Sequence, residues 1–178
     1  MSLAGPLDAP LIVTANLPPD LQGWATGLRR AHFPPERNVL AAHVTLFHAL
    51  PPSCNAELAD LLACLAREYA PPPARLEGVM SLGRGTALRL SSPAILALRE
   101  RIADRFHGAL TPQDSHAPRL HVTVQNKVTT REAKALQAQL APQVAPRSFA
   151  FSGLGLHIYR GGPWEKVKDF AFRGHLAP

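Results

Sequence analysis

His43-Val44-Thr45-Leu46 and His121-Val122-Thr123-Val124 are two nearly identical tetrapeptides, set 78 residues apart in a chain of 178. Each lies in an apolar run rich in β-branched residues, 39–50 and 120–128, which predicts a strand. Successive side chains of a strand alternate between its two faces, so the His and the Thr of each copy point the same way. The sequence therefore predicts two strands that each present an imidazole beside a hydroxyl, with the apolar residue between them facing a core.

This duplicated motif resembles that of the two-histidine (HxTx) phosphoesterase superfamily, the group of the bacterial 2′-5′ RNA ligases and RNA 2′,3′-cyclic phosphodiesterases. The matching residues are His43, Thr45, His121 and Thr123, and the predicted elements resemble the family's over about residues 10–174. The resemblance implies an α+β fold with two lobes related by a pseudo-twofold axis. Each lobe would be an antiparallel sheet with helices on its outer face, and the two motifs would face each other across a central cleft.

The remaining elements agree with a duplication, because each half of the chain is expected to run helix, motif strand, helix, strand, strand. We expect one two-lobed domain over residues 1–178, with one motif in each half. In the first predicted helix, Leu21, Trp24 and Leu28 form the apolar stripe. Arg29 and Arg30 near its C-terminal end are interpreted as cations that complement the helix dipole. Residues 147–159 are predicted to form one strand, and residues 165–172 another.

The overall composition is that of a globular protein, with 46% hydrophobic and 18% charged residues. The formal net charge of +6 favours a polyanionic partner, with nucleic acid first. Cys54 and Cys64 lie too far apart in one predicted helix for a disulfide, and no apolar run is long enough to cross a membrane. We therefore expect a cytoplasmic protein that does not bind membranes, acts as a monomer and needs no obligatory protein partner.

Two histidines and two hydroxyls around one cleft suit phosphodiester chemistry. One of His43 and His121 would take a proton from the attacking oxygen while the other gives a proton to the leaving oxygen; the sequence leaves open which does which. Thr45 and Thr123 would donate hydrogen bonds to the non-bridging phosphate oxygens. No metal or other cofactor is needed. A zinc site is the alternative, but the further histidines, His48, His116 and His157, form no metal-ligand spacing with the motifs.

Several other residues are candidate substrate contacts. Gln125 and Phe47 continue the alternation of the motif strands and are expected to face the cleft, whereas Tyr159 and Trp164 near the last hairpin could stack on a base. His116 precedes the second motif and is interpreted as a surface residue. Family members often carry an Arg shortly after the second motif, where this chain has Asn126 followed by Lys127. The candidates to replace its charge are Lys127, Arg119 and Arg160.

The resemblance implies an enzyme that opens a 2′,3′-cyclic phosphate at an RNA end to a 2′-phosphate, and that joins 2′-5′ ends when an RNA hydroxyl is the nucleophile. Two alternatives remain open from the sequence. One is a cyclic phosphodiesterase acting on a small nucleotide, such as ADP-ribose 1″,2″-cyclic phosphate. The other is an RNA-binding module of the same fold that does little catalysis.

Overall fold

Two four-stranded antiparallel sheets form the framework of the structure, a computed structural model that describes residues 9–178. The first sheet has the strand order β2-β1-β7-β8 and the second has the order β5-β4-β3-β6. In the first sheet the strands are β1 (Leu11–Asn16), β2 (Val44–Leu50), β7 (Gly153–Tyr159) and β8 (Trp164–Ala171). In the second they are β3 (Pro73–Ser81), β4 (Thr86–Ser91), β5 (His121–Gln125) and β6 (Arg147–Ala150).

Four helices accompany the sheets, namely α1 (Pro19–His32), α2 (Asn55–Glu68), α3 (Pro93–Arg105) and α4 (Thr130–Leu140). Three single 3₁₀ turns add Pro35–Arg37, Pro52–Cys54 and His107–Ala109. Helices α3 and α4 each begin at a capping residue that is visible in the sequence. The Ser92 hydroxyl accepts a hydrogen bond from the backbone N–H of Ile95, and Thr129 and Glu132 form a capping box.

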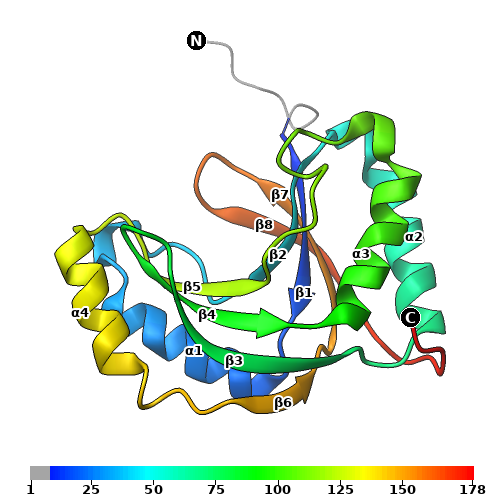
Figure 1. The fold of residues 1–178 in the computed structure, drawn as a ribbon. Coiled ribbons are helices and arrows are strands. Elements are labelled where there is room, and N and C mark those ends of the chain that lie inside the picture. Colours follow the sequence, from blue (N-terminus) through cyan, green and yellow to red (C-terminus); the bar gives the residue numbers. More distant parts are fainter. Residues whose placement is uncertain (1–8) are drawn as a thin grey trace, which may run out of the picture.

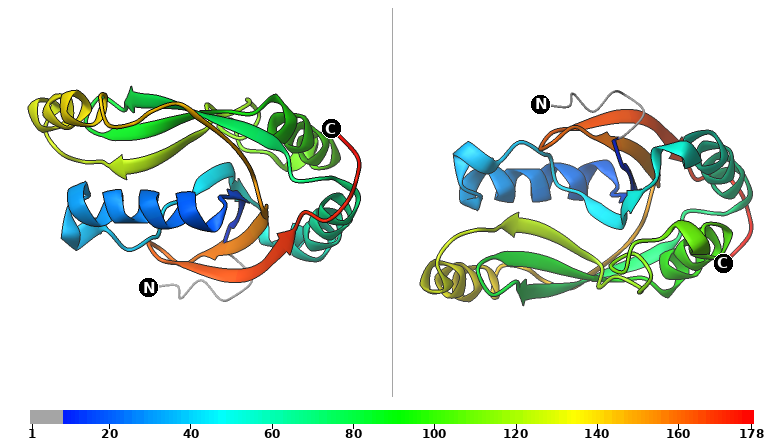
Figure 2. Two further views of the ribbon diagram at one scale, coloured as in Figure 1. Left: turned by 90° about the horizontal axis from the view of Figure 1, so that it is seen from below. Right: turned by 90° about the horizontal axis from the view of Figure 1, so that it is seen from above.

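The two sheets lie in two layers, as the views from below and above show (Figure 2). The layer of the first sheet carries α1 and α2, and the layer of the second carries α3 and α4 (Figures 1 and 2). Helix α1 also packs against β5 of the other layer. A single cluster of buried apolar side chains runs through both layers. The expected bilobal α+β architecture is confirmed.

The motif strands β2 and β5 occupy equivalent places, since each is the edge strand of its own sheet. Within its sheet, β2 pairs with β1, and β5 pairs with β4. The two edge strands contact each other between the lobes. The duplicated sequence thus corresponds to a duplicated position in the fold, and this brings the two motifs to one place.

The lobes are not the two halves of the chain, because the first sheet combines the N-terminal strands with the C-terminal ones (Figure 1). The single strand predicted over residues 147–159 is therefore wrong. It divides into β6 and β7, which belong to different sheets. The chain crosses between the lobes at Phe151, which is fully buried, and at Ser152, whose N–H donates to the Asn16 carbonyl.

The first motif strand begins at Val44 and not near residue 39 as predicted. The segment before it is a loop over helix α1, and α1 takes up its polar backbone groups. Gln22 donates to the Ala42 carbonyl, the Ala42 N–H donates to Thr26, and Arg29 donates to the Leu40 carbonyl. This backbone is satisfied by side chains of the helix, so it does not pair as a strand.

Candidate active site

The two motif histidines are held by the same local hydrogen bond. Nδ1 of His43 lies 2.9 Å from the carbonyl oxygen of Ala41, and Nδ1 of His121 lies 2.6 Å from that of Arg119. A carbonyl oxygen only accepts, so in both rings Nδ1 carries the hydrogen and donates it. This leaves Nε2 of each ring as the atom available to a substrate, which is the arrangement that proton transfer requires.

The two motif threonines sit beside these histidines at matching depths. Thr45 and Thr123 are both half-buried, whereas Val44 and Val122, between the His and the Thr, are buried. Within residues 9–178 neither threonine hydroxyl is engaged by a side-chain hydrogen bond. Both hydroxyls are therefore free to donate to an incoming oxygen atom.

His43 has a distinctive environment, because the ring of Trp164 packs on it with the ring centres 4.5 Å apart. Burial lowers the pKa of His43 from 6.5 to about 4, and the cations of Arg29 and of protonated His157 and His121 act in the same direction. The bond to Ala41 opposes this shift and is outweighed. At neutral pH His43 is therefore an uncharged imidazole whose Nε2 can accept a proton.

A row of polar side chains continues from His43 across the first sheet. Nε2 of His157 lies 3.1 Å from the Thr14 hydroxyl, which bonds to Asn16, and Asn16 donates to Asp169. Gly155 makes room for this row, since a Cβ there would lie 2.5 Å from the Thr14 hydroxyl oxygen and 2.9 Å from Nε2 of His157. The glycine is thus required by its neighbours' side chains.

The same row forms one wall of a pocket of about 720 Å³ next to His43, which we call the His43 pocket. Its other walls come from the N-terminal part of α1 and from the loop 39–42. A volume of this size falls in the range that accommodates a small organic ligand. Trp164 and His43 both line it, so a ligand held there would touch the candidate catalytic base.

Two buried arginines connect the lobes, and neither is among the functional residues expected from the sequence. Arg29 of α1 is 3% exposed and donates to the carbonyl of Leu40 before the first motif, and to that of Thr123 in the second motif. Arg99 of α3 is 2% exposed and donates to the carbonyl of Leu46 in the first motif, and to that of Asp114 before the second. The pseudo-twofold symmetry of the fold therefore extends to these cations.

Arg29 and Arg30 both lie in the last turn of α1, as predicted, but the side chain of Arg29 is buried there. A signal was present in the spacing: residues 21, 25 and 29 repeat every four positions and share one helix face. In the structure Leu21, Ala25 and Arg29 are the buried residues of α1, whereas Trp24 is 40% exposed.

The expectation that Phe47 and Gln125 face the cleft is wrong, and one cause explains both. Each strand pair has an irregularity directly after the motif threonine, where β1 pairs Val13 with Phe47 and Thr14 with Thr45, and β4 pairs Thr86 with Gln125 and Ala87 with Thr123. A bulge of this kind inserts one residue and reverses the alternation beyond it. Phe47 is fully buried under the Arg99 guanidinium, and the side chain of Gln125 accepts from the buried Thr86 hydroxyl.

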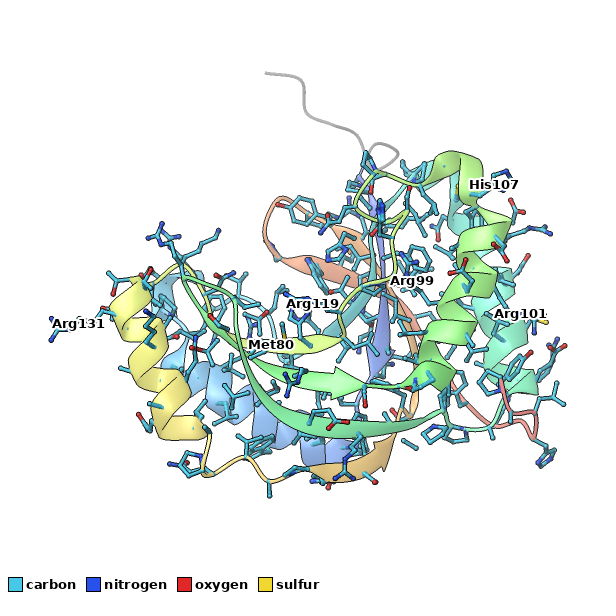
Figure 3. All side chains as sticks on the ribbon, viewed as in Figure 1. Met80, Arg99, Arg101, His107, Arg119 and Arg131 are labelled. Atoms are coloured by element: carbon cyan, nitrogen blue, oxygen red, sulfur yellow. The ribbon has the colours of Figure 1, made fainter. Side chains whose placement is uncertain are left out.

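The other candidates divide into those near the motifs and those away from them. Trp164 contacts His43, and Arg119 lines a second pocket together with His121. Tyr159 is 40% exposed, and Arg160 pairs with Glu165 on the hairpin. Lys127 is exposed in the turn after β5, with a positive φ of 58°. Figure 3 labels Arg119 near β5, between the lobes, and Arg131 at the outer side of α4.

Metal-ligand groups do not gather at this site. Across residues 9–178 there is no group of three or more His, Cys, Asp or Glu side chains placed to hold a metal ion.

Comparison with known proteins identifies the family. Residues 17–163 match the model of the 2′-5′ RNA ligase superfamily, which covers most of the chain. The chain belongs to this superfamily. The resemblance inferred from the two HxT motifs is therefore confirmed at the level of the family, and no curated protein sequence matches the chain.

Solved structures of this superfamily's fold superpose over nearly the whole chain. TT0787 of Thermus thermophilus matches with a TM-score of 0.63 and 19% identity, covering 94% of this chain and 100% of its own. E. coli LigT complexed with NADP+ matches with a TM-score of 0.60 and 19% identity, and LigT complexed with 3′-AMP with 0.58 and 17%; each covers 93% of this chain and 98% of its own. At this identity the likeness establishes the fold.

Among residues 9–178 no helix is long and apolar enough to span a membrane.

Proposed function

We propose that this protein opens 2′,3′-cyclic phosphates at RNA ends to 2′-phosphates by general acid and base catalysis. The observation that carries the proposal is the matched setting of His43 and His121. Each has Nδ1 bonded to a backbone carbonyl and a half-buried threonine two residues further along the same strand. Membership of the 2′-5′ RNA ligase superfamily supports a phosphoester substrate. The net charge of +6 supports a polyanion.

The surroundings of His43 support one assignment of the two roles. The lowered pKa of His43 favours its neutral form, so His43 is the base that takes a proton from the attacking water. As the water oxygen bonds to phosphorus, the bond from phosphorus to the 3′-oxygen breaks. Protonated His121 gives its proton to that oxygen. The products are a 2′-phosphate and a 3′-hydroxyl, and solvent returns the two histidines to their starting states.

The threonines stabilise the charge that builds on the non-bridging oxygens. Thr45 and Thr123 each offer one hydroxyl donor, and neither is already used by another side chain of residues 9–178. No metal takes part in this scheme. When an RNA hydroxyl replaces water as the nucleophile, the same steps join two ends through a 2′-5′ linkage.

A second candidate keeps the chemistry and changes the substrate to a small cyclic nucleotide. The His43 pocket favours this alternative, since its volume of about 720 Å³ is enough for one nucleoside. LigT, which shares the fold, has been crystallised with 3′-AMP and with NADP+, and this supports a nucleotide ligand.

The test is incubation of the purified protein with a short RNA that ends in a 2′,3′-cyclic phosphate, in the presence of EDTA. We expect conversion to the 2′-phosphate, and none by the His43→Ala/His121→Ala variant. His107→Ala is the matched control, because His107 is exposed at the outer side of the end of α3 (Figure 3). Equal conversion by the double variant, or activity that EDTA removes and zinc restores, would refute the scheme.

A further inference from the structure

A second, smaller pocket lies beside the other catalytic histidine. It measures about 230 Å³ and is lined by His121 but not by His43, whereas the His43 pocket is lined by His43 but not by His121. We call it the His121 pocket. Its polar walls are His48 of β2, Arg99 of α3, and Asp114, His116 and Arg119 of the loop before β5. Each catalytic histidine thus has a pocket of its own.

The carboxylate in this pocket is already fully engaged. Asp114 is 1% exposed and accepts hydrogen bonds from the backbone N–H groups of His48 and Ala49 and from Nδ1 of His48, the last at 3.1 Å. Arg99 lies near enough to interact electrostatically with this carboxylate. Asp114 is therefore part of the wall and is turned toward β2. It fixes the His48 ring so that Nε2, at the opposite edge, is left for a ligand.

The remaining groups of the pocket favour an anion. The lining contains two guanidinium groups and one carboxylate, so its net charge is positive even when the three histidines are neutral. Arg119 is exposed and forms no ion pair with a carboxylate among residues 9–178. The pocket is smaller than the usual range for a whole organic ligand, but it holds several times the volume of a water molecule. A phosphate group with part of its sugar suits both the charge and the size.

A third pocket adjoins the His121 pocket on the side away from His121. Met80 and Arg119 line both the His121 pocket and a further one of about 570 Å³. The further pocket has apolar walls from Val79, Leu96 and Pro118, and it also contains Arg89. Its volume suits a nucleoside. Moving outward from His121, a phosphate-sized basic pocket is therefore followed by a nucleoside-sized one, which is the repeat of a nucleic acid chain.

We propose that the His121 pocket binds the phosphodiester that joins the terminal nucleotide to the rest of an RNA chain. The protein then selects oligonucleotide ends over single cyclic nucleotides. This inference rests on the proposed function and adds the length of the substrate to it. In it, His48 and Arg119 contact the penultimate phosphate, and the pocket beyond Met80 receives the preceding nucleoside.

The test compares kcat/KM for a dinucleotide ending in a 2′,3′-cyclic phosphate with kcat/KM for the mononucleoside 2′,3′-cyclic phosphate. We expect the wild type to prefer the dinucleotide by about tenfold or more, as one charge-assisted contact would give. Arg119→Ala and His48→Asn should each reduce that ratio by about tenfold, the usual effect of losing such a contact. The Asn side chain of His48→Asn can still donate a hydrogen bond to Asp114. This variant therefore removes Nε2 of His48 and keeps the hydrogen bond that Nδ1 makes to Asp114.

Arg131→Ala is the charge-matched control, since Arg131 is exposed and projects from the outer side of α4 (Figure 3). It should leave the ratio at the wild-type value. A wild-type ratio near one, or the same ratio in Arg119→Ala as in Arg131→Ala, overturns the inference while leaving the proposed function in place.

If neither substrate is turned over, the proposed function fails, and binding then decides the inference. The dissociation constants of a dinucleotide 2′-phosphate and a mononucleoside 2′-phosphate would be measured by calorimetry. Tighter binding of the dinucleotide that Arg119→Ala removes would support the pocket. Equal binding of the two ligands would overturn it.

Discussion

Nη1 of Arg29 donates to the carbonyl oxygen of Thr123 across 2.9 Å, and so joins a helix of one lobe to the motif strand of the other. The reciprocal bond runs from Nε of Arg99 to the carbonyl oxygen of Leu46. Each motif strand is thereby fixed by an arginine from the opposite lobe. The separation of the two histidines is set by these bonds as well as by the sheets.

Replacing Arg29 separates its two effects on the site. Arg29→Met should lower the free energy of unfolding by about 3 kcal/mol, because buried carbonyls lose their donor. It should also move the acid limb of kcat/KM to higher pH, because the cation that lowers the pKa of His43 is gone. Arg29→Lys retains the charge, so its limb should stay near the wild-type position. Urea unfolding and pH–rate profiles measure the two effects; identical profiles for all three proteins would contradict this.

The activity should tolerate acid better than an ordinary histidine base would allow. Because the pKa of His43 is about 4, protonation of His43 should not reduce kcat/KM near pH 6.5. The decrease should come only as the pH approaches 4. The measurement is a kcat/KM profile from about pH 4 to about pH 9 with the cyclic phosphate substrate, which spans the acid limb. An acid limb at 6.5 would show that His43 is not the base.

Stability should depend on pH through the same residue, with a defined sign. The pKa of His43 is lower in the folded protein than the value of 6.5 for the free side chain, so the unfolded chain takes up a proton first as the pH falls. The contribution of His43 is therefore complete above pH 6.5 and is lost between 6.5 and about 4. Urea midpoints at about pH 7 and about pH 5 should differ less in His43→Gln than in the wild type. An equal difference in both proteins would argue against the lowered pKa.

Trp164 should lower the pKa of His43 by covering the ring of this histidine. Its ring lies 4.5 Å from that of His43, and burial is the largest cause of the lowered pKa. Trp164→Ala should therefore raise the pKa of His43 and shift the acid limb upward, whereas Trp164→Phe should shift it less. NMR titration of the His43 ring protons measures this directly. A lower activity with an unchanged titration curve would instead assign Trp164 to substrate contact alone.

The two threonines should matter for turnover and little for folding. Thr45→Ala and Thr123→Ala are each expected to reduce kcat by about 10²-fold, as for loss of one donor to the transition state. The corresponding Ser variants retain the hydroxyl and should recover most of the rate. Single-turnover kinetics with matched thermal melting curves would test this. Wild-type rates in either Ala variant would remove the threonine from the mechanism.

Much of the fold could be predicted because its information is local. The duplicated HxT, the Ser92 cap and the Thr129–Glu132 capping box are each contained in a short stretch of sequence. The family and the bilobal α+β fold follow from the first of these and are confirmed. The roles of the four motif residues remain predictions.

What could not be predicted depends on pairing between distant segments. The bulges after Thr45 and Thr123 exist only in register with β1 and β4, so a strict alternation placed Phe47 and Gln125 on the wrong face. Arg29 is buried because its partners, Leu40 and Thr123, arrive from other elements. The division of residues 147–159 into two strands likewise follows from which sheet each part joins.

The interleaving of the two sheets bears on how the protein is assembled during synthesis. All four strands of the second sheet lie within residues 73–150, so that sheet can pair as soon as this segment has left the ribosome. In the first sheet, β1 must wait for β7, which lies near the other end of the chain. Such long-range pairing is slow to form. The lobe that carries His43 is therefore completed last, and in a nascent chain the sheet that carries His121 is complete before the sheet that carries His43.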